Sequence, residues 1–116
     1  MDRKIRIGAV SYLNTKPLTY GLSRLPIKDE IDLITDYPAK IASKLRNNEI
    51  DIGLIPVAAI PNLNEHYIIG SHCIGCFGAV HSVAIFSDIP LQEVKFMMLD
   101  YQSRTSVILA RILLNE

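Results

Sequence analysis

Ile5-Arg6-Ile7-Gly8-Ala9-Val10 runs directly into Ser11-Tyr12-Leu13-Asn14-Thr15-Lys16-Pro17, and this stretch decides the fold. Its first six residues are largely apolar, which predicts a buried strand. Pro17 suits the first position of a helix, because its missing N–H is not needed there and its φ is already helical. Thr15 or Lys16 then lies near the helix cap. The stretch therefore predicts one strand-to-helix unit.

The same arrangement occurs twice more along the chain. Residues 31–35 are predicted to form a strand, followed by a helix from about Pro38 through Asn47. Residues 50–55 are predicted to form a third strand, and Pro56 begins a short helical segment through residue 60. Three strand-to-helix units favour an α/β domain with a parallel sheet.

The second half of the chain follows a different pattern. Residues 67–69, 79–86 and 94–99 are predicted to form strands, with a turn or hinge at residues 87–90. A helix over residues 104–114 comes last. It is apolar on nearly every side, so we expect it to be buried on more than one side. Because nothing downstream could bury it, we expect the chain to be an N-terminal fragment or to pair with another copy.

Composition limits the classes of function. The chain has 116 residues, 49% of them hydrophobic, which predicts one ordinary domain with a well-filled core. Its 12 basic and 12 acidic residues give zero net charge, so we expect neither a nucleic-acid partner nor a membrane partner. No apolar run has the length of a signal peptide or a membrane helix. The expected location is cytoplasmic.

Leu99-Asp100-Tyr101-Gln102-Ser103-Arg104-Thr105-Ser106 joins an apolar run to a helix through hydroxyl and guanidinium groups. The first N–H groups of a helix have no partner within it and attract anions. Ser103, Thr105 and Ser106 add hydroxyl donors, and Arg104 adds a fork that matches a carboxylate. The stretch predicts an anion site, with a simple N-cap as the alternative.

Two cysteines and three histidines are candidate metal or redox groups. Cys73 and Cys76 lie among glycines rather than at the start of a helix, so we expect both to be small, partly buried residues without a metal. A redox or metal role is the alternative. His66, His72 and His81 are expected to be structural or surface residues.

Three motifs carry a resemblance to a known family: Val10-Ser11-Tyr12-Leu13-Asn14-Thr15-Lys16-Pro17-Leu18, Asp51-Ile52-Gly53-Leu54-Ile55-Pro56-Val57, and residues 99–106. Together they resemble the chorismate dehydratase family of menaquinone biosynthesis (MqnA type). The resemblance implies a two-lobed fold of the periplasmic-binding-protein type II class. Residues 1–90 would form most of its first lobe, a parallel α/β sheet, and residues 91–116 the start of a truncated second lobe.

The resemblance also implies an activity. It predicts a cytoplasmic lyase of the futalosine pathway that removes water from chorismate to give 3-[(1-carboxyvinyl)oxy]benzoate. A positioned base can remove the hydrogen at C3 while the C4 hydroxyl leaves and the ring becomes aromatic, so no cofactor is expected. The general base is not identified, and we expect the isolated chain to be inactive.

Site residues follow from the resemblance and from side-chain chemistry. In the implied fold, the loop after the first strand and the start of the last helix approach one ligand from opposite sides. The expected substrate-binding residues are Ser11, Tyr12, Ser103, Arg104, Thr105 and Ser106. The expected catalytic residues are Asn14, which can orient a hydroxyl, and Ser82, which the resemblance places against the substrate. In a strand, His81 and Ser82 would point to opposite faces, and Ser82 is the one expected to face the cleft.

Two other functions fit the same sequence. One is the sibling enzyme 1,4-dihydroxy-6-naphthoate synthase, which resembles this family and acts on a later intermediate. The other is a non-catalytic, small-anion solute-binding or effector-sensing module of the same fold, because a fold alone does not determine activity. The oligomeric state is left open.

Overall fold

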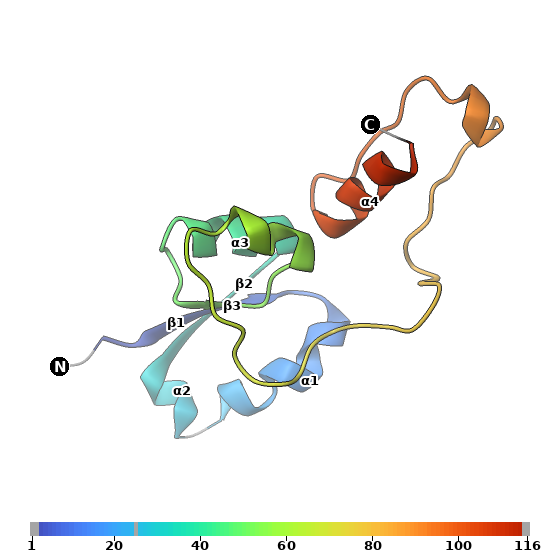
Figure 1. The fold of residues 1–116 in the computed structure, drawn as a ribbon. Coiled ribbons are helices and arrows are strands. Elements are labelled where there is room, and N and C mark those ends of the chain that lie inside the picture. The colour runs from blue at the N-terminus through green and yellow to red at the C-terminus, as the bar shows by residue number, and fades with distance from the viewer. Residues whose placement is uncertain (1–2, 25, 115–116) are drawn as a thin grey trace.

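A computed structural model describes residues 3–24 and 26–114. Its centre is a three-stranded parallel sheet with the strand order β2-β1-β3 (Figure 1). β1 (Ile5–Val10) pairs along its whole length with β2 (Ile31–Asp36), with Ile5 opposite Ile31 and Val10 opposite Asp36. The α/β class and the parallel sheet predicted from the sequence are both confirmed.

The third strand is shorter than predicted. β3 covers only Ile52–Gly53, with Gly53 opposite Gly8 of β1. Backbone hydrogen bonds continue on both sides of it: Asp51 N–H donates to the carbonyl of Arg6 (2.8 Å) and Leu54 N–H to the carbonyl of Gly8 (2.9 Å). Residues 51–54 thus follow β1 closely, although only two of them form regular strand.

Helix α3 (Pro38–Arg46) covers one face of the sheet, and its Ile41 is fully buried. Gly8 lies beneath it, where a Cβ would come within 2.5 Å of Ile50 Cδ1 and 3.1 Å of Ile41 Cγ2. Only glycine lets the helix approach this closely. The helix ends at Asn47, and Asn48 takes a positive φ of 58°, which asparagine tolerates well. The predicted helix and its end are confirmed.

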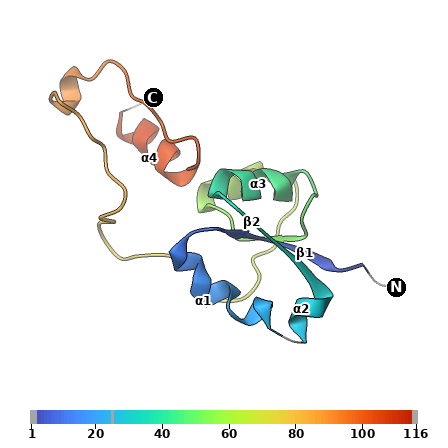
Figure 2. The same ribbon diagram turned by 180° about the vertical axis from the view of Figure 1, so that it is seen from behind.

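Short helices cover the opposite face of the sheet (Figures 1 and 2). The 3₁₀ helix η1 (Leu13–Thr15) leads into α1 (Lys16–Thr19), with Pro17 in its first turn as predicted. The 3₁₀ helix η2 (Gly21–Ser23) and α2 (Ile27–Glu30) follow.

After β3, the predicted helical segment forms as the 3₁₀ helix η3 (Val57–Asn62).

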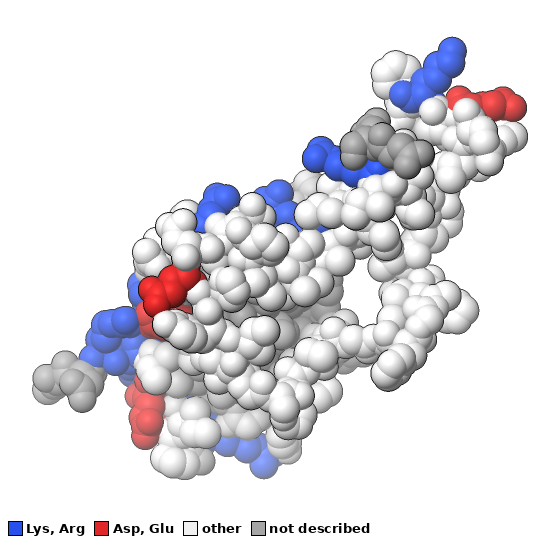
Figure 3. Space-filling view, in the orientation of Figure 1, with Lys and Arg blue, Asp and Glu red and all other residues white. Residues whose placement is uncertain are grey.

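Residues 63–100 leave this unit as a long arc that the two ribbon views show from opposite sides (Figures 1 and 2). Figure 3 shows an open gap between the arc and the rest of the molecule, and a mostly uncharged face. Apart from the 3₁₀ helix η4 (Leu91–Glu93), the arc has no regular element. The strands predicted at 67–69, 79–86 and 94–99 are therefore wrong, because no neighbouring strand accepts their backbone hydrogen bonds.

The arc overturns two further expectations. Cys73 and Cys76 are exposed thiols rather than partly buried residues, since no layer of the structure covers this segment. His81 and Ser82 lie in a turn, closed by Val83 N–H donating to the carbonyl of Val80 (3.3 Å), so strand alternation does not separate them.

Helix α4 (Thr105–Leu113) forms as predicted and lies beside η3. The expectation that it is buried on more than one side is wrong, because none of its residues is buried and Ile112 and Leu113 are 63% and 59% exposed. Packing on one short 3₁₀ helix cannot cover an all-round apolar surface. No helix in the described ranges has the length and apolar character needed to cross a bilayer.

Candidate functional site

The carboxyl ends of β1 and β2 place polar residues at one edge of the sheet. Ser11 N–H donates to the carbonyl of Asp36 (3.0 Å), which extends the β1–β2 ladder by one residue. Thr15 N–H then donates to the carbonyl of Tyr12 (3.1 Å) and closes η1. These bonds hold residues 11–15 against the sheet edge, where open α/β sheets bind their ligands.

The turn before α4 reaches the same edge. Ala39 N–H, in the first turn of α3, donates to the carbonyl of Gln102 (3.1 Å). The Tyr12 hydroxyl donates to Gln102 Oε1 (3.1 Å), and Gln102 Nε2 donates to the Tyr101 hydroxyl (2.9 Å). The Tyr101 ring meets the Tyr37 ring edge-on at 5.8 Å. Two loops about ninety positions apart in the chain, as the Tyr12–Gln102 pair shows, thus lie side by side.

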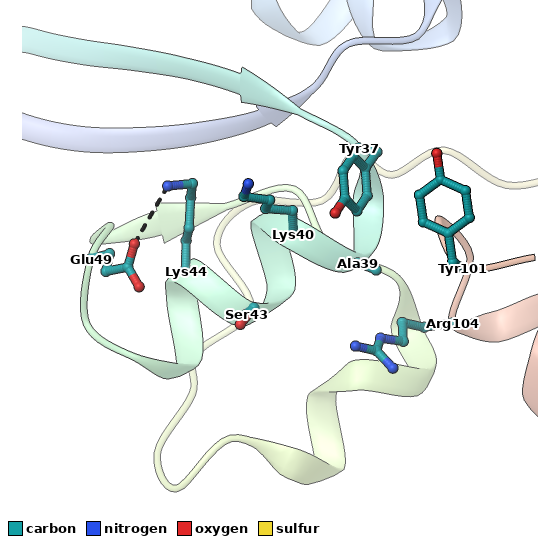
Figure 4. A pocket seen from close by; sticks show the side chains of 8 residues that line it. All are labelled: Tyr37, Ala39, Lys40, Ser43, Lys44, Glu49, Tyr101 and Arg104. Atoms are coloured by element: carbon teal, nitrogen blue, oxygen red, sulfur yellow. Dashed lines mark hydrogen bonds and ion pairs between the residues drawn. The ribbon is translucent and has the colours of Figure 1, made fainter.

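The larger of the two hollows described here has a volume of about 260 Å³ and runs along α3, from this edge to the far end of the helix (Figure 4). Two tyrosine rings, Tyr37 and Tyr101, stand at one end of it, and Lys40, Lys44 and Arg104 line it with Glu49. Lys44 Nζ lies 3.4 Å from Glu49 Oε2. Three cations against one carboxylate make this hollow suitable for an anion.

Hydrogen bonds account for the acidity of the one carboxyl group in that hollow. The Asn47 amide and then the Lys44 ammonium donate to Glu49, and both lower its pKa below the ordinary value for glutamate. Glu49 therefore stays ionised and occupies Lys44, which leaves Lys40 and Arg104 to meet an incoming anion.

The smaller hollow, of about 110 Å³, lies between η1, α1 and the end of β2. Five hydroxyl side chains and one ammonium line it: Ser11, Tyr12, Thr15, Thr19, Thr35 and Lys16. Thr15 is the most enclosed of these, with only 2% of its surface exposed. Among the residues described here, its hydroxyl has no hydrogen-bond partner.

The predicted binding residues fall into different places. Ser11 and Tyr12 line the smaller hollow, and Arg104 lines the larger one. The Ser103 hydroxyl accepts the N–H of Ser106 (3.3 Å) at the start of α4, a bond of the kind that the N-cap alternative predicts. Thr105 is exposed at the start of α4.

The two predicted catalytic residues lie apart from both hollows. Asn14 is exposed in η1 and lines neither of them. Ser82 is exposed in the arc of residues 63–100. Sequence reasoning also missed Thr15, Thr35 and Lys40 as lining residues. Thr35 could have been found, because it is a hydroxyl residue at the carboxyl end of a predicted strand.

The strongest ion pair lies at the opposite edge of the sheet. Asp51 accepts two hydrogen bonds from the Arg3 guanidinium (2.7 and 2.9 Å), and the backbone N–H and the guanidinium of Arg6 also donate to it. Bonds from Arg3 and then from Arg6 hold the pKa of the Asp51 carboxyl well below its usual range. This cluster ties β3 to β1 and belongs to the fold.

No cluster of histidine, cysteine, aspartate or glutamate that could hold a metal ion occurs in residues 3–24 and 26–114.

Comparison with known proteins defines the family. No solved structure matches the chain. A family model described as menaquinone biosynthesis matches residues 5–116, which include both loops at the carboxyl edge of the sheet. This chain belongs to the menaquinone biosynthesis family.

Proposed function

We propose that the protein is a chorismate dehydratase, a lyase that removes water from chorismate to give 3-[(1-carboxyvinyl)oxy]benzoate. Membership of the menaquinone biosynthesis family supports an enzyme with a small-molecule substrate. The observation that carries the proposal is the meeting of residues 11–15 and 101–104 at one sheet edge, beside a hollow lined by Arg104 and Lys40. Chorismate is a dianion, and the positively charged side chains of such a hollow can bind its carboxylates.

The reaction itself requires positioning more than a cofactor. A base removes the hydrogen at C3 as a proton, the electron pair of that C–H bond forms the C3–C4 double bond, and the C–O bond at C4 breaks. The departing hydroxide takes up one proton, so that water is released. The ring becomes aromatic, which drives the step. The protein then has to hold two carboxylates, orient the departing hydroxyl and place a base.

Arg104 is the residue best suited to hold one substrate carboxylate. Arg104 lines the larger hollow together with Tyr101, and a guanidinium can bind a carboxylate through two parallel hydrogen bonds. Lys40, in the first turn of α3, lines the same hollow and adds a second positive charge. An aromatic wall beside two cations suits a ring that carries a carboxylate.

A two-lobed molecule is part of the proposal. Residues 1–90 would form most of the first lobe and residues 91–116 the start of the second. The exposed apolar surface of α4 and of residues 63–100 supports a further lobe that packs against them. Closure of the two lobes would bring Asn14 and Ser82 to the substrate, Asn14 to orient the leaving hydroxyl and Ser82 to contact the ring.

The test is to incubate purified protein with chorismate and to follow the product by liquid chromatography and mass spectrometry. We expect a protein in which this chain is joined to the proposed second lobe to form the water-loss product without added metal or nucleotide. This chain alone should form none. Arg104→Ala should lower kcat/KM about tenfold or more, because a hydrogen bond to a charged group contributes about 1.5–3 kcal/mol.

Arg24→Ala is the matched control for that variant. Arg24 is also an exposed arginine beside a tyrosine, 4.0 Å from the ring centroid of Tyr20, but it lines neither hollow. Activity should survive its loss. Equal losses in the two variants, or binding of chorismate without any product, would contradict the proposal.

A binding module is the second candidate. The separation of Asn14 and Ser82 from both hollows favours it, since the cations alone can hold an anion without chemistry. The variant Asn14→Ala distinguishes the two functions. In an enzyme this change should lower kcat far more than it weakens substrate binding, whereas a binding module has no turnover to lose.

A further inference from the structure

The hydroxyl of Thr15 is buried at the smaller hollow without a hydrogen-bond partner in the described part of the chain. The residue is 2% exposed, and its hydroxyl oxygen is closed off from solvent. The neighbouring Thr19 hydroxyl lies close by but donates to the backbone carbonyls of Thr15 (3.3 Å) and Lys16 (3.5 Å). It therefore leaves the Thr15 hydroxyl unsatisfied.

An unsatisfied buried hydroxyl is unfavourable for folding, because the group gives up its hydrogen bonds to water and gains none. A valine would fill the same volume without that penalty. A threonine in this place is therefore explained by something that the folded chain alone does not supply, namely a group that enters the hollow and bonds to the hydroxyl.

The lining determines the chemistry of that group. Five hydroxyl residues, Lys16 and Val10 line the hollow, and its lining residues include no carboxylate. The net charge of the lining favours an anion. At about 110 Å³ against about 260 Å³, this is the smaller of the two hollows, which favours a small group such as one carboxylate over a ring.

We propose that this hollow is a carboxylate subsite, in which the Thr15 hydroxyl donates a hydrogen bond to the bound group and Lys16 supplies the positive charge. The inference rests on the proposed function in one respect: the carboxylate is one of the two on the substrate, while Arg104 holds the other. Tyr12 lines the subsite and bonds to Gln102, whose neighbour Tyr101 lines the larger hollow.

Acetate is the probe, with acetamide as its neutral counterpart of the same shape. The ¹⁵N-labelled chain is titrated with each at fixed pH and ionic strength, and the amide signals of Thr15, Lys16 and Thr35 are followed by NMR. We expect saturable shifts with acetate and none with acetamide. Thr15→Val should weaken acetate binding at least fivefold, and Thr15→Ser, which keeps the hydroxyl, should stay within twofold.

Thermal unfolding separates a ligand-binding hydroxyl from a structural one. Because the hydroxyl is unpaired in the free protein, Thr15→Val should leave the Tm unchanged or raise it. Ser23→Ala removes an exposed hydroxyl outside the hollow and should change neither acetate binding nor its site. Lys16→Gln should weaken acetate binding without lowering the Tm.

Three results would overturn the subsite: equal shifts with acetate and acetamide, equal acetate affinity in Thr15→Val and the unchanged protein, or a Tm lowered by Thr15→Val. Each differs from a failure of the proposed function. If the subsite is wrong, chorismate can still lose water with unchanged KM in Thr15→Val. If the dehydratase proposal is wrong, acetate still binds and no product forms.

Discussion

Residues 3–62 and residues 63–114 both contain many apolar side chains, but only the first region buries them. Every buried apolar residue in the described part of the chain lies between Ala9 and Ala59. In the second region, Phe86, Phe96 and Met98 are each more than nine-tenths exposed. The first region has a parallel sheet with helices on both faces, whereas the described part of the second has α4 and an arc that contains the short η4.

The difference shows that apolar content alone does not make a core. In the first region β1 pairs with β2 across the short helices of residues 11–30 and with β3 after α3, so the strand hydrogen bonds form where the helices cover the sheet. In the second region the strand-like runs have no partner strand within the described chain. Their apolar side chains need a surface from elsewhere, and the proposed second lobe is that surface.

The largest expected effect is in the core of the first region. Ile41→Ala should lower the free energy of unfolding by about 2–5 kcal/mol, because it leaves a cavity between α3 and the sheet at a fully buried position. Phe86→Ala in the arc is the matched control and should change it by about 0.5 kcal/mol or less. Urea unfolding measures both, and similar losses in the two variants would contradict the comparison.

A smaller effect is expected at the closest approach of helix and sheet. Gly8→Ala should cost about 1–3 kcal/mol, because the added methyl group meets Ile50 and Ile41 beneath α3. Gly21→Ala introduces the same group in η2, where nothing lies within 4 Å, and should be neutral or slightly stabilising. Thermal unfolding of the two variants separates close packing from a general intolerance of alanine.

Acid should weaken the first region through Asp51. Its pKa is held below the ordinary value in the folded state by Arg3 and then Arg6, so the unfolded chain binds the proton first. The stabilisation is present at neutral pH and decreases as the pH falls below about 5, through the ordinary range of aspartate. Asp51→Asn should lower the Tm at pH 7 and flatten the dependence of Tm on pH. A variant with an unchanged acid profile would show that the cluster contributes nothing.

The smallest effect is expected where the two regions meet. Tyr12→Phe removes the hydroxyl that donates to Gln102 and should cost about 0.5–1 kcal/mol, because the bond is exposed. In this variant the Ala39 amide, which donates to the carbonyl of Gln102, should also exchange its hydrogen faster. Tyr67→Phe removes the hydroxyl that donates to Glu65 within the arc and should leave Ala39 unchanged.

The sequence predicts the first region well because its signals are local. Pro17, Pro38 and Pro56 mark the helix starts within a few residues of each strand, and Asn47 marks the end of α3. The strands predicted in the arc fail for a nonlocal reason. A strand is completed by its neighbour, and no property of residues 79–86 reveals whether a neighbour is present.

The candidate site divides in the same way. Arg104 and Tyr12, which line the two hollows, could be singled out from the sequence because their side chains are distinctive and lie in recognisable motifs. Thr15 could not, since a threonine before a helix is ordinarily a cap. Its importance depends on the burial of its hydroxyl between η1, α1 and β2, which is a property of the packed molecule.

Hydrogen–deuterium exchange with and without chorismate tests most directly whether the two regions share one ligand site. The account predicts that chorismate slows exchange at residues 11–15 and at residues 101–106 together, while residues 67–86 are unaffected in this chain. Slower exchange at only one of the two loops, or at neither, would contradict a shared site at the carboxyl edge of the sheet.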